Sequence, residues 1–259
     1  MTHVFHRHLK VDPPTVASGD GIYLIDTYGK RYLDGSGGAA VSCLGHSDAD
    51  VIAAIKAQAD KVCFAHTSFL TSEPAEKLAD LLIAKAPTGI SSVYFVSGGS
   101  EAVEAALKLA RQYFLEIGQP SRTRFIARLQ SYHGNTLGAL GVGGNPARRE
   151  PFKTLLAKSS HISPCYTYRL QTDDESEEEY AIRAANELET EILRLGPENV
   201  AAFIAETVGG ATAGVIPPAK GYFRRIREIF VPYDVLCILV EVLCLTSILT
   251  RRRRPPEPP

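Results

Sequence analysis

Two uninterrupted apolar runs limit the possible fold more than any other feature of this sequence. They cover residues 201–205 and 235–240, and runs of five or six apolar residues are typical of parallel strands that are covered on both faces. The segment 182–195 lies just before the first run and has helical periodicity, ending at Gly196-Pro197. Strands that alternate with helices predict an α/β protein with an open, mostly parallel sheet and flanking helices.

A short β-hairpin is predicted before this alternating region. Residues 21–26 and 30–34 have strand character and flank the turn Thr27-Tyr28-Gly29. Two amphipathic helices follow, the first opened by Asp48 or Asp50 and the second capped by Ser72. We therefore assign residues 1–70 to an N-terminal segment and 71–242 to a large domain. Residues 243–259, which are apolar, then basic, then proline-rich, are assigned to a tail that is unrelated to that domain. The apolar residues expected to face inward on these helices are Ile52, Ile55, Ala59, Val62, Leu78, Leu81 and Leu82.

Composition excludes several classes of partner. The net charge of −1 over 259 residues shows no excess of positive charge that would favour binding to nucleic acid or to an anionic membrane. The five cysteines have neither CxxC nor metal-ligand spacing, so we expect reduced, buried thiols and no metal site. The first 16 residues lack the apolar core of a secretory signal. The expected location is therefore cytoplasmic, with a mitochondrial location left open.

A strand, two glycines and a helix form the first candidate site. The strand is predicted over residues 93–96, and Gly98, Gly99 and Ser100 lead from it into an amphipathic helix. Free amides at the first helical turn attract phosphate, and glycines let the backbone approach it closely. The structural alternative is a tight strand-to-helix turn. A P-loop or a dinucleotide fingerprint is disfavoured, because neither GxxxxGK[ST] nor GxGxxG spacing is present.

Two other predicted strands also end in chemically useful residues. Tyr132 and His133 follow the strand at 124–129, and Glu206 follows the strand at 201–205. Ligands of open α/β sheets bind beyond the carboxyl ends of strands, so a phosphate seat, an aromatic face and a carboxylate there would suit a flat phosphorylated cofactor. Structural alternatives exist for each residue. Tyr132 could simply pack, His133 could hold a turn by hydrogen bonds, and Glu206 could cap a local amide.

These segments, taken in order, resemble the N-terminal part of a class III aminotransferase of pyridoxal-phosphate (PLP) fold-type I. The resemblance runs from Gly21 to about Glu228. The segments that carry it are Tyr32-Leu33-Asp34-Gly35, Gly37-Gly38-Ala39-Ala40-Val41, Leu44-Gly45-His46, Ser97-Gly98-Gly99-Ser100-Glu101-Ala102, Tyr132-His133-Gly134-Asn135-Thr136, Ala205-Glu206-Thr207-Val208-Gly209-Gly210, Gly214-Val215-Ile216-Pro217-Pro218 and Gly221-Tyr222-Phe223.

The resemblance implies a function and a set of cofactor-binding residues. Gly99 and Ser100 would hold the PLP phosphate, Tyr132 would stack on the pyridine ring, and Glu206 would sit beside the cofactor and help to order the site. His133 is also predicted to be a cofactor-binding residue. The implied reaction moves an amino group between a small-molecule amino donor and an oxo acceptor. The implied assembly is a homodimer, with neither nucleic acid nor membrane as a partner.

Two departures from the family pattern bear on catalysis. The family places an aspartate beside the pyridinium nitrogen, and the matching position here is Val240. The family also supplies a later lysine that forms the Schiff base, whereas this sequence has no lysine after Lys220. The chain is therefore expected to lack catalytic residues and to be inactive. The alternative function is that of a non-catalytic remnant that binds PLP or a partner subunit.

The end of the sequence allows two interpretations. Residues 235–249 are strongly apolar and precede four arginines and a proline-rich stretch, which could indicate a membrane anchor. The run is short for a membrane span of about 20 residues, and Glu241 lies in its middle. We therefore predict a buried strand at 235–240, a disordered segment after Leu249, and no anchor.

Overall fold

The computed structural model describes residues 3–242 and 248–250. The chain divides into two compact units, Met1–Leu78 and Ala79–Pro259, which we call the N-terminal unit and the C-terminal unit. Each is described by itself. The domain boundaries proposed from the sequence, after residues 70 and 242, remain a prediction.

The N-terminal unit contains a small antiparallel sheet in the order β1-β2-β3. Its middle and last strands form the predicted hairpin, with Tyr23 opposite Leu33. The Asp26 carboxylate holds the turn, since it accepts hydrogen bonds from the Tyr28 and Lys30 amides at 2.9 Å and from the Tyr32 hydroxyl at 2.8 Å. The elements that begin in this unit are β1 (Val16–Asp20), β2 (Tyr23–Asp26), β3 (Arg31–Leu33), α1 (Gly37–Ala40), α2 (Ala49–Lys61) and α3 (Glu73–Lys85).

Helices α2 and α3 form where the sequence predicts them, but their apolar faces are not buried. Asp48 caps α2 by accepting a hydrogen bond from the Val51 amide at 2.9 Å. Neither helix contains a buried residue, so the expectation that Ile52 or Leu81 faces a core is wrong. Burial of an amphipathic stripe requires a packed partner, and among the described residues none of the side chains on these two helices is fully buried.

The C-terminal unit is built around a five-stranded sheet in the order β5-β4-β6-β7-β8. The first four strands are parallel, and β8 pairs with β7 in the antiparallel direction. This arrangement confirms the predicted α/β class with a mostly parallel sheet. Its elements are α4 (Gly99–Glu116), β4 (Arg124–Arg128), α5 (Leu137–Val142), α6 (Pro146–Arg149), η1 (Glu150–Leu155), β5 (Ser160–Ile162), α7 (Thr167–Leu170), α8 (Glu177–Leu195), η2 (Pro197–Asn199), β6 (Val200–Glu206), α9 (Tyr222–Tyr233), β7 (Leu236–Val240) and β8 (Ile248–Thr250).

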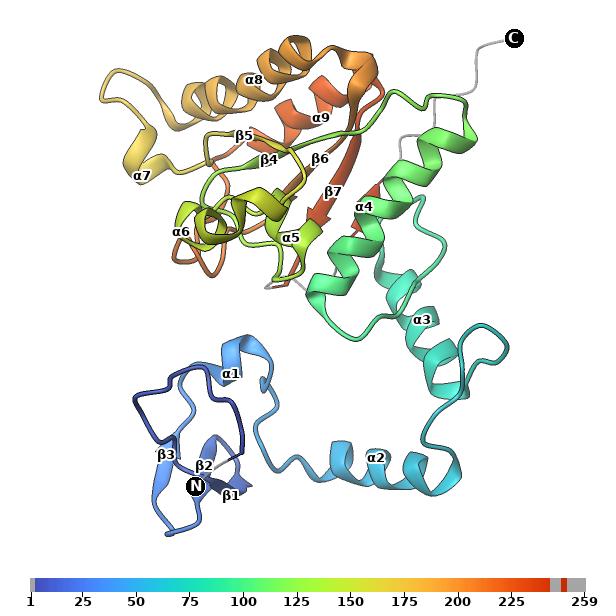
Figure 1. The fold of residues 1–259 in the computed structure, drawn as a ribbon, viewed down its shortest axis with the longest axis vertical. Coiled ribbons are helices and arrows are strands. Elements are labelled where there is room, and N and C mark those ends of the chain that lie inside the picture. The colour runs from blue at the N-terminus through green and yellow to red at the C-terminus, as the bar shows by residue number, and fades with distance from the viewer. Residues whose placement is uncertain (1–2, 243–247, 251–259) are drawn as a thin grey trace. The chain divides into compact units, whose positions relative to one another are not determined.

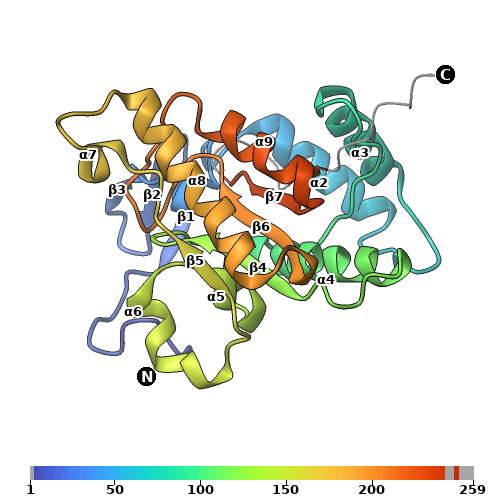
Figure 2. The same ribbon diagram turned by 90° about the horizontal axis from the view of Figure 1, so that it is seen from above.

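Both faces of this sheet are covered, as the uninterrupted apolar runs predict. Helices α8 and α9 cover one face, while α4 and α5 pack on the other (Figures 1 and 2). Successive side chains of a strand point to opposite faces. Accordingly, Phe203 packs in the cluster under α8 and α9, and Ile204 packs in the cluster under α4 and α5. Every residue of β6 is buried.

The boundaries of α8 follow directly from its sequence. Ser176 and Glu179 form a reciprocal capping box, in which each side chain accepts a hydrogen bond from the backbone amide of the other residue. The helix ends at Gly196, whose φ of 83° places it outside the helical region, and Pro197 follows. The acidic residues Glu177, Glu178 and Glu179 occupy the first turn of the helix, where carboxylates complement the helix dipole.

The predicted strand at residues 93–96 is not formed. The segment is not assigned to a sheet, and the Tyr94 side chain is 78% exposed. β-branched and aromatic residues favour extended backbone, but a strand also needs a neighbour that exchanges hydrogen bonds with it. In the described part of the chain no strand pairs with this segment.

The last two strands of the sheet agree with only part of the prediction for residues 235–259. The strand predicted at 235–240 is β7, and Thr250 lies in β8 even though disorder was expected after Leu249. The remainder of that tail, residues 251–259, lies outside the described residues, as does Cys244. Across 3–242 and 248–250, no helix is both long enough and apolar enough to cross a membrane.

The expectation of buried thiols holds for only two of the four cysteines that the structure describes. Cys165 and Cys237 are buried, and burial raises the pKa of both thiols, to about 12 for Cys237. Cys43 and Cys63 are exposed. They lie in the N-terminal unit, where Cys63 follows the unburied helix α2.

Candidate functional site

The first turn of α4 offers backbone donors to a ligand. Gly98 caps the helix in an extended conformation with φ of −170°. Within the described residues, the amides of Gly99, Ser100 and Glu101 have no hydrogen-bond acceptor. A Cβ atom added at Gly98 or Gly99 would meet nothing within 4 Å. Amides without acceptors at the positive end of the helix dipole favour an anion, and the side-chain directions at the two glycines are free of other atoms.

The loop that follows β4 lies against this helix start. The Ser100 hydroxyl accepts a hydrogen bond from the Asn135 amide at 2.9 Å. Gly134 has φ of +133°, and a Cβ atom built there would lie 2.6 Å from the Ser100 hydroxyl oxygen and 2.9 Å from the Ala139 Cβ. Only glycine fits this approach without a shift of its neighbours.

Glu206 connects the same loop to the end of β6. Its carboxylate is buried and accepts hydrogen bonds from the Tyr132 amide at 3.2 Å and from the Gly210 amide at 3.1 Å. The alternative that Glu206 caps local amides therefore describes what it does in this structure. Burial raises the pKa of Glu206, although the two amides and the Arg128 guanidinium act in the opposite direction.

The Tyr132 ring is not a simple packing residue. The Arg148 guanidinium lies 4.8 Å from the centroid of that ring, which is cation–π geometry. Asn145 positions Arg148, because its side chain caps α6 by accepting a hydrogen bond from the Arg148 amide at 3.1 Å. The sequence predicted neither contact. The Asn-Pro start of a short helix was the only signal for it.

His133 is buried without hydrogen bonds. Its side chain is 3% exposed, and neither ring nitrogen has a partner among the described residues. The alternative that His133 holds a turn by hydrogen bonds is therefore wrong. Burial lowers the pKa of His133 to about 3, and the nearby charges of Arg128 and His161 act in the same direction. The buried hydroxyls of Thr136 and Thr207 are also unpartnered within the part of the chain that is described.

The structure thus brings all five predicted residues to one edge of the sheet in the C-terminal unit. Hydrogen bonds join the start of α4 to the loop after β4, and that loop to Glu206. Val240 lies directly beside Glu206 in the register of β6 and β7, and its side chain is 4% exposed. Within residues 3–242 and 248–250, no cluster of His, Cys, Asp or Glu could hold a metal ion.

Comparison with known proteins identifies the family. The sequence matches the family described as Aminotransferase class-III over residues 6–246. The chain belongs to the class III aminotransferases. It is 47% identical over 242 residues to an uncharacterized aminotransferase of Schizosaccharomyces pombe, covering 93% of this chain and 53% of that protein. It is 39% identical over 235 residues to the mitochondrial gamma-aminobutyrate transaminase 1 of rice, Oryza sativa subsp. japonica, covering 90% of this chain and 45% of that protein.

Solved structures show the same likeness. The omega transaminase from Pseudomonas jessenii in complex with PMP superposes with a TM-score of 0.87 at 35% identity, covering 94% of this chain and 55% of that one. This class III aminotransferase chain therefore has the fold of those transaminases over its described length. It spans about half the length of the curated relatives it matches.

The buried His133 makes the stability of this class III aminotransferase chain depend on pH. Its pKa is lowered from 6.5 to about 3 on folding, so between those values the unfolded chain binds the additional proton. The contribution of the neutral, buried His133 to the free energy of unfolding is therefore fully present above pH 6.5. It is lost progressively as the pH falls from 6.5 toward 3. We expect the free energy of unfolding to fall by about 1.4 kcal/mol per pH unit from this residue between pH 6 and 5, measured by urea unfolding.

Two substitutions make that measurement specific. A His133→Leu variant cannot titrate at this position and should show a correspondingly shallower dependence on pH. A His8→Leu variant removes an exposed histidine and should keep the slope of the original chain. Equal slopes for the original chain and His133→Leu would show that His133 is already protonated, or solvated, in the folded state.

Proposed function

We propose that the C-terminal unit binds PLP, with its phosphate on the amides of Gly99 and Ser100. The observation that carries the proposal is the set of three helix-start amides that lack acceptors among the described residues, next to two glycines at which an added Cβ would meet nothing within 4 Å. The contact between Ser100 and Asn135 places that set against the loop that carries Tyr132. A phosphate would satisfy the amides and complement the helix dipole.

The other predicted residues fit the rest of the cofactor in different ways. The Tyr132 ring would stack on the pyridine ring, and the buried, unpartnered nitrogens of His133 lie in the same loop. Glu206 would order this edge, because it holds the amides of Tyr132 and Gly210. When bound, PLP supplies an aldehyde carbon and an electron-withdrawing ring. The likeness to a transaminase solved with PMP, the aminated form of this cofactor, supports the assignment.

Val240, at the position proposed to face the pyridine nitrogen of PLP, does not suit the cofactor as the other residues do. Val240 lies beside Glu206, where the family resemblance implies an aspartate. A valine cannot keep a proton on the pyridine nitrogen, whereas a neighbouring carboxylate favours the protonated form. We therefore propose PLP-dependent amino transfer as the function of the family to which this chain contributes the cofactor-binding part, and propose that residues 1–259 by themselves hold PLP without activating it. The alternative is non-catalytic binding of PLP or of a partner subunit.

Substrates, assembly and location complete the proposal. Relatives named gamma-aminobutyrate transaminases support a small-molecule amino donor and an oxo acceptor for the family's reaction. We further propose a homodimer, for which the unburied apolar faces of α2 and α3 offer surface. The rice relative is named as mitochondrial, and a cytoplasmic or mitochondrial location for this chain remains a prediction.

Titration of the polypeptide with PLP and with pyridoxal tests the phosphate seat. PLP should bind, and pyridoxal, which lacks the phosphate, should bind at least about tenfold more weakly because the helix-start amides contribute nothing to it. A Gly99→Asp variant places a carboxylate at the amides and should weaken PLP binding on the same order, since like charges repel. A Gly35→Asp variant adds the same charge where an added Cβ also meets open space, and it should bind PLP normally. Equal affinity for PLP and pyridoxal would exclude the seat.

A further inference from the structure

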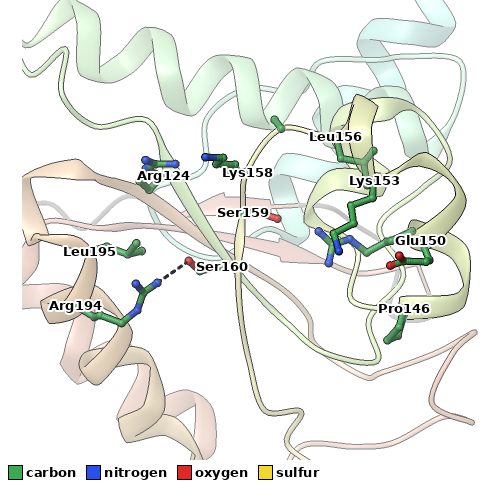
Figure 3. Close-up of a pocket in the computed structure, with 12 residues that line it drawn as sticks. Arg124, Pro146, Glu150, Lys153, Leu156, Lys158, Ser159, Ser160, Arg194 and Leu195 are labelled. Atoms are coloured by element: carbon green, nitrogen blue, oxygen red, sulfur yellow. Dashed lines mark hydrogen bonds between the residues drawn. The ribbon is translucent and has the colours of Figure 1, made fainter.

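A pocket lies at the end of the parallel strands that is opposite to the candidate cofactor site. Its volume is about 580 Å³, which is within the range of small-molecule sites. Arg124 is the first residue of β4 and Ser160 the first residue of β5, so the pocket opens at the amino ends of these strands. The candidate cofactor site lies at their carboxyl ends. Figure 3 shows Arg124 and Lys158 on one side of the pocket, with Lys153 and Glu150 on the other.

The pocket has a strong excess of positive charge. Its lining contains one carboxylate, Glu150, and five cationic side chains, which are Arg124, Arg149, Lys153, Lys158 and Arg194. Arg194 forms an ion pair with Glu191 at 2.6 Å. For the other four cations, no ion pair is found within the residues that the structure describes. A chain with a net charge of −1 therefore concentrates uncompensated positive charge in one concave place.

Arg149 shows that this charge is partly built into the structure. One guanidinium nitrogen, Nη2, donates to the Gly141 carbonyl at 3.2 Å. Its Nε atom is buried and has no partner within the described part of the chain. An arginine that is positioned by a backbone carbonyl, without a carboxylate, keeps its charge available to a ligand. The two serines of the lining are already engaged, because the Ser159 hydroxyl donates to the Gly141 carbonyl and the Ser160 hydroxyl accepts from Arg194 at 3.5 Å.

We propose that this pocket binds a small phosphorylated anion. Lysine and arginine side chains are the usual charged partners of phosphate oxygens. The cations surround a pocket rather than follow a long surface, which fits a small molecule better than a nucleic acid. Among the described residues no aromatic side chain lines the pocket, so recognition rests on the charged group and not on a stacked base. The inference stands independently of the proposed PLP site.

Calorimetric titration of the full chain with pyrophosphate tests the proposal. Arg124 and Lys158 line the pocket (Figure 3), are exposed and are not part of the buried core. The double variant Arg124→Gln/Lys158→Gln should therefore fold and bind pyrophosphate on the order of tenfold more weakly. A matched variant, Lys108→Gln/Arg227→Gln, removes one exposed lysine and one exposed arginine elsewhere in the C-terminal unit. It should retain the affinity of the original chain.

Two further titrations, one of the Gly99→Asp variant and one with citrate, show where pyrophosphate binds and whether the pocket prefers phosphate. Pyrophosphate could also reach the amides at the start of α4, so Gly99→Asp is titrated in parallel. Retained binding in Gly99→Asp with loss in Arg124→Gln/Lys158→Gln supports the pocket, whatever the outcome of the PLP test. Equal pyrophosphate affinity of Arg124→Gln/Lys158→Gln and Lys108→Gln/Arg227→Gln would overturn the proposal, as would loss of pyrophosphate binding in Gly99→Asp alone. Citrate binding as tightly as pyrophosphate would also overturn it, because the pocket would then recognise negative charge without a preference for phosphate.

Discussion

Residues 1–259, produced as a single polypeptide and supplied with PLP, are expected to show no transaminase turnover above that of free PLP in buffer. Two amino-acid positions lead to this expectation. Val240 lies buried beside Glu206 at the proposed ring-nitrogen position, and no lysine follows Lys220. The resemblance implies that a later lysine holds the cofactor covalently and carries the proton between substrate and cofactor atoms, and none of the lysines in residues 1–259 stands at that place of the family pattern. The loss is therefore expected to be complete rather than partial.

The measurement combines an activity assay with chemical trapping. Amino transfer from gamma-aminobutyrate or alanine to an oxo acid is followed with the Pseudomonas jessenii omega transaminase as the positive control. Borohydride reduction and mass spectrometry then search for a PLP adduct on any lysine. Turnover together with one defined lysine adduct would contradict the expectation. A Val240→Asp variant should remain inactive, because restoring a carboxylate supplies no amine.

Replacing Gly134 by alanine is expected to lower the free energy of unfolding by roughly 2–5 kcal/mol. The new Cβ atom would lie 2.6 Å from the Ser100 hydroxyl oxygen, 2.8 Å from the Ser100 Cα and 2.9 Å from the Ala139 Cβ. The residue also has φ of +133°, which L-amino acids rarely adopt. Relief of these contacts would push the loop after β4 away from the start of α4, so PLP binding should weaken as well. Urea unfolding followed by circular dichroism measures the first effect.

Gly98→Ala is the matched control for this substitution. Gly98 has extended backbone with φ of −170°, and an added Cβ would meet nothing within 4 Å. The change should therefore cost under about 1 kcal/mol, mainly through its effect as a helix cap. If Gly134→Ala were no more destabilising than Gly98→Ala, the close approach between the loop and α4 would not exist in solution.

Local chemistry explains why much of this fold could be predicted from the sequence. The uninterrupted apolar runs became β6 and β7 because residues that are apolar on both faces need cover on both sides. The start of α8 at Ser176 and its end at Gly196 depend on caps that lie within a few residues of each boundary. The edge of the sheet that collects Tyr132 and Glu206 was predictable because parallel strands share their carboxyl ends. Ser100 reaches the same edge through its contact with Asn135, although the strand predicted before it is not formed.

The remaining features depend on neighbours that are distant in sequence. Residues 93–96 have strand composition, but pairing is a property of two segments, and the composition of one segment cannot supply the second. The absence of hydrogen bonds at His133 among the described residues likewise depends on the atoms packed around it. The basic pocket draws Arg124, Lys158 and Arg194 from separate parts of the chain. Each of these residues alone is an ordinary exposed cation, and no spacing in the sequence relates them.

The pairing of β4 with β6 sets an order of events during synthesis of the chain. β4 ends at Arg128 and its partner β6 begins at Val200, so about 70 residues separate them. At about 5–20 residues per second, the ribosome needs roughly 4–14 s to make that stretch. β5 can pair with β4 on one side in the meantime, while the other edge of β4 remains open. An open strand edge templates pairing with other chains. During synthesis there is therefore an interval in which the edge of β4 that will later pair with β6 is open. In that interval, binding of a chaperone to this edge would compete with aggregation through it.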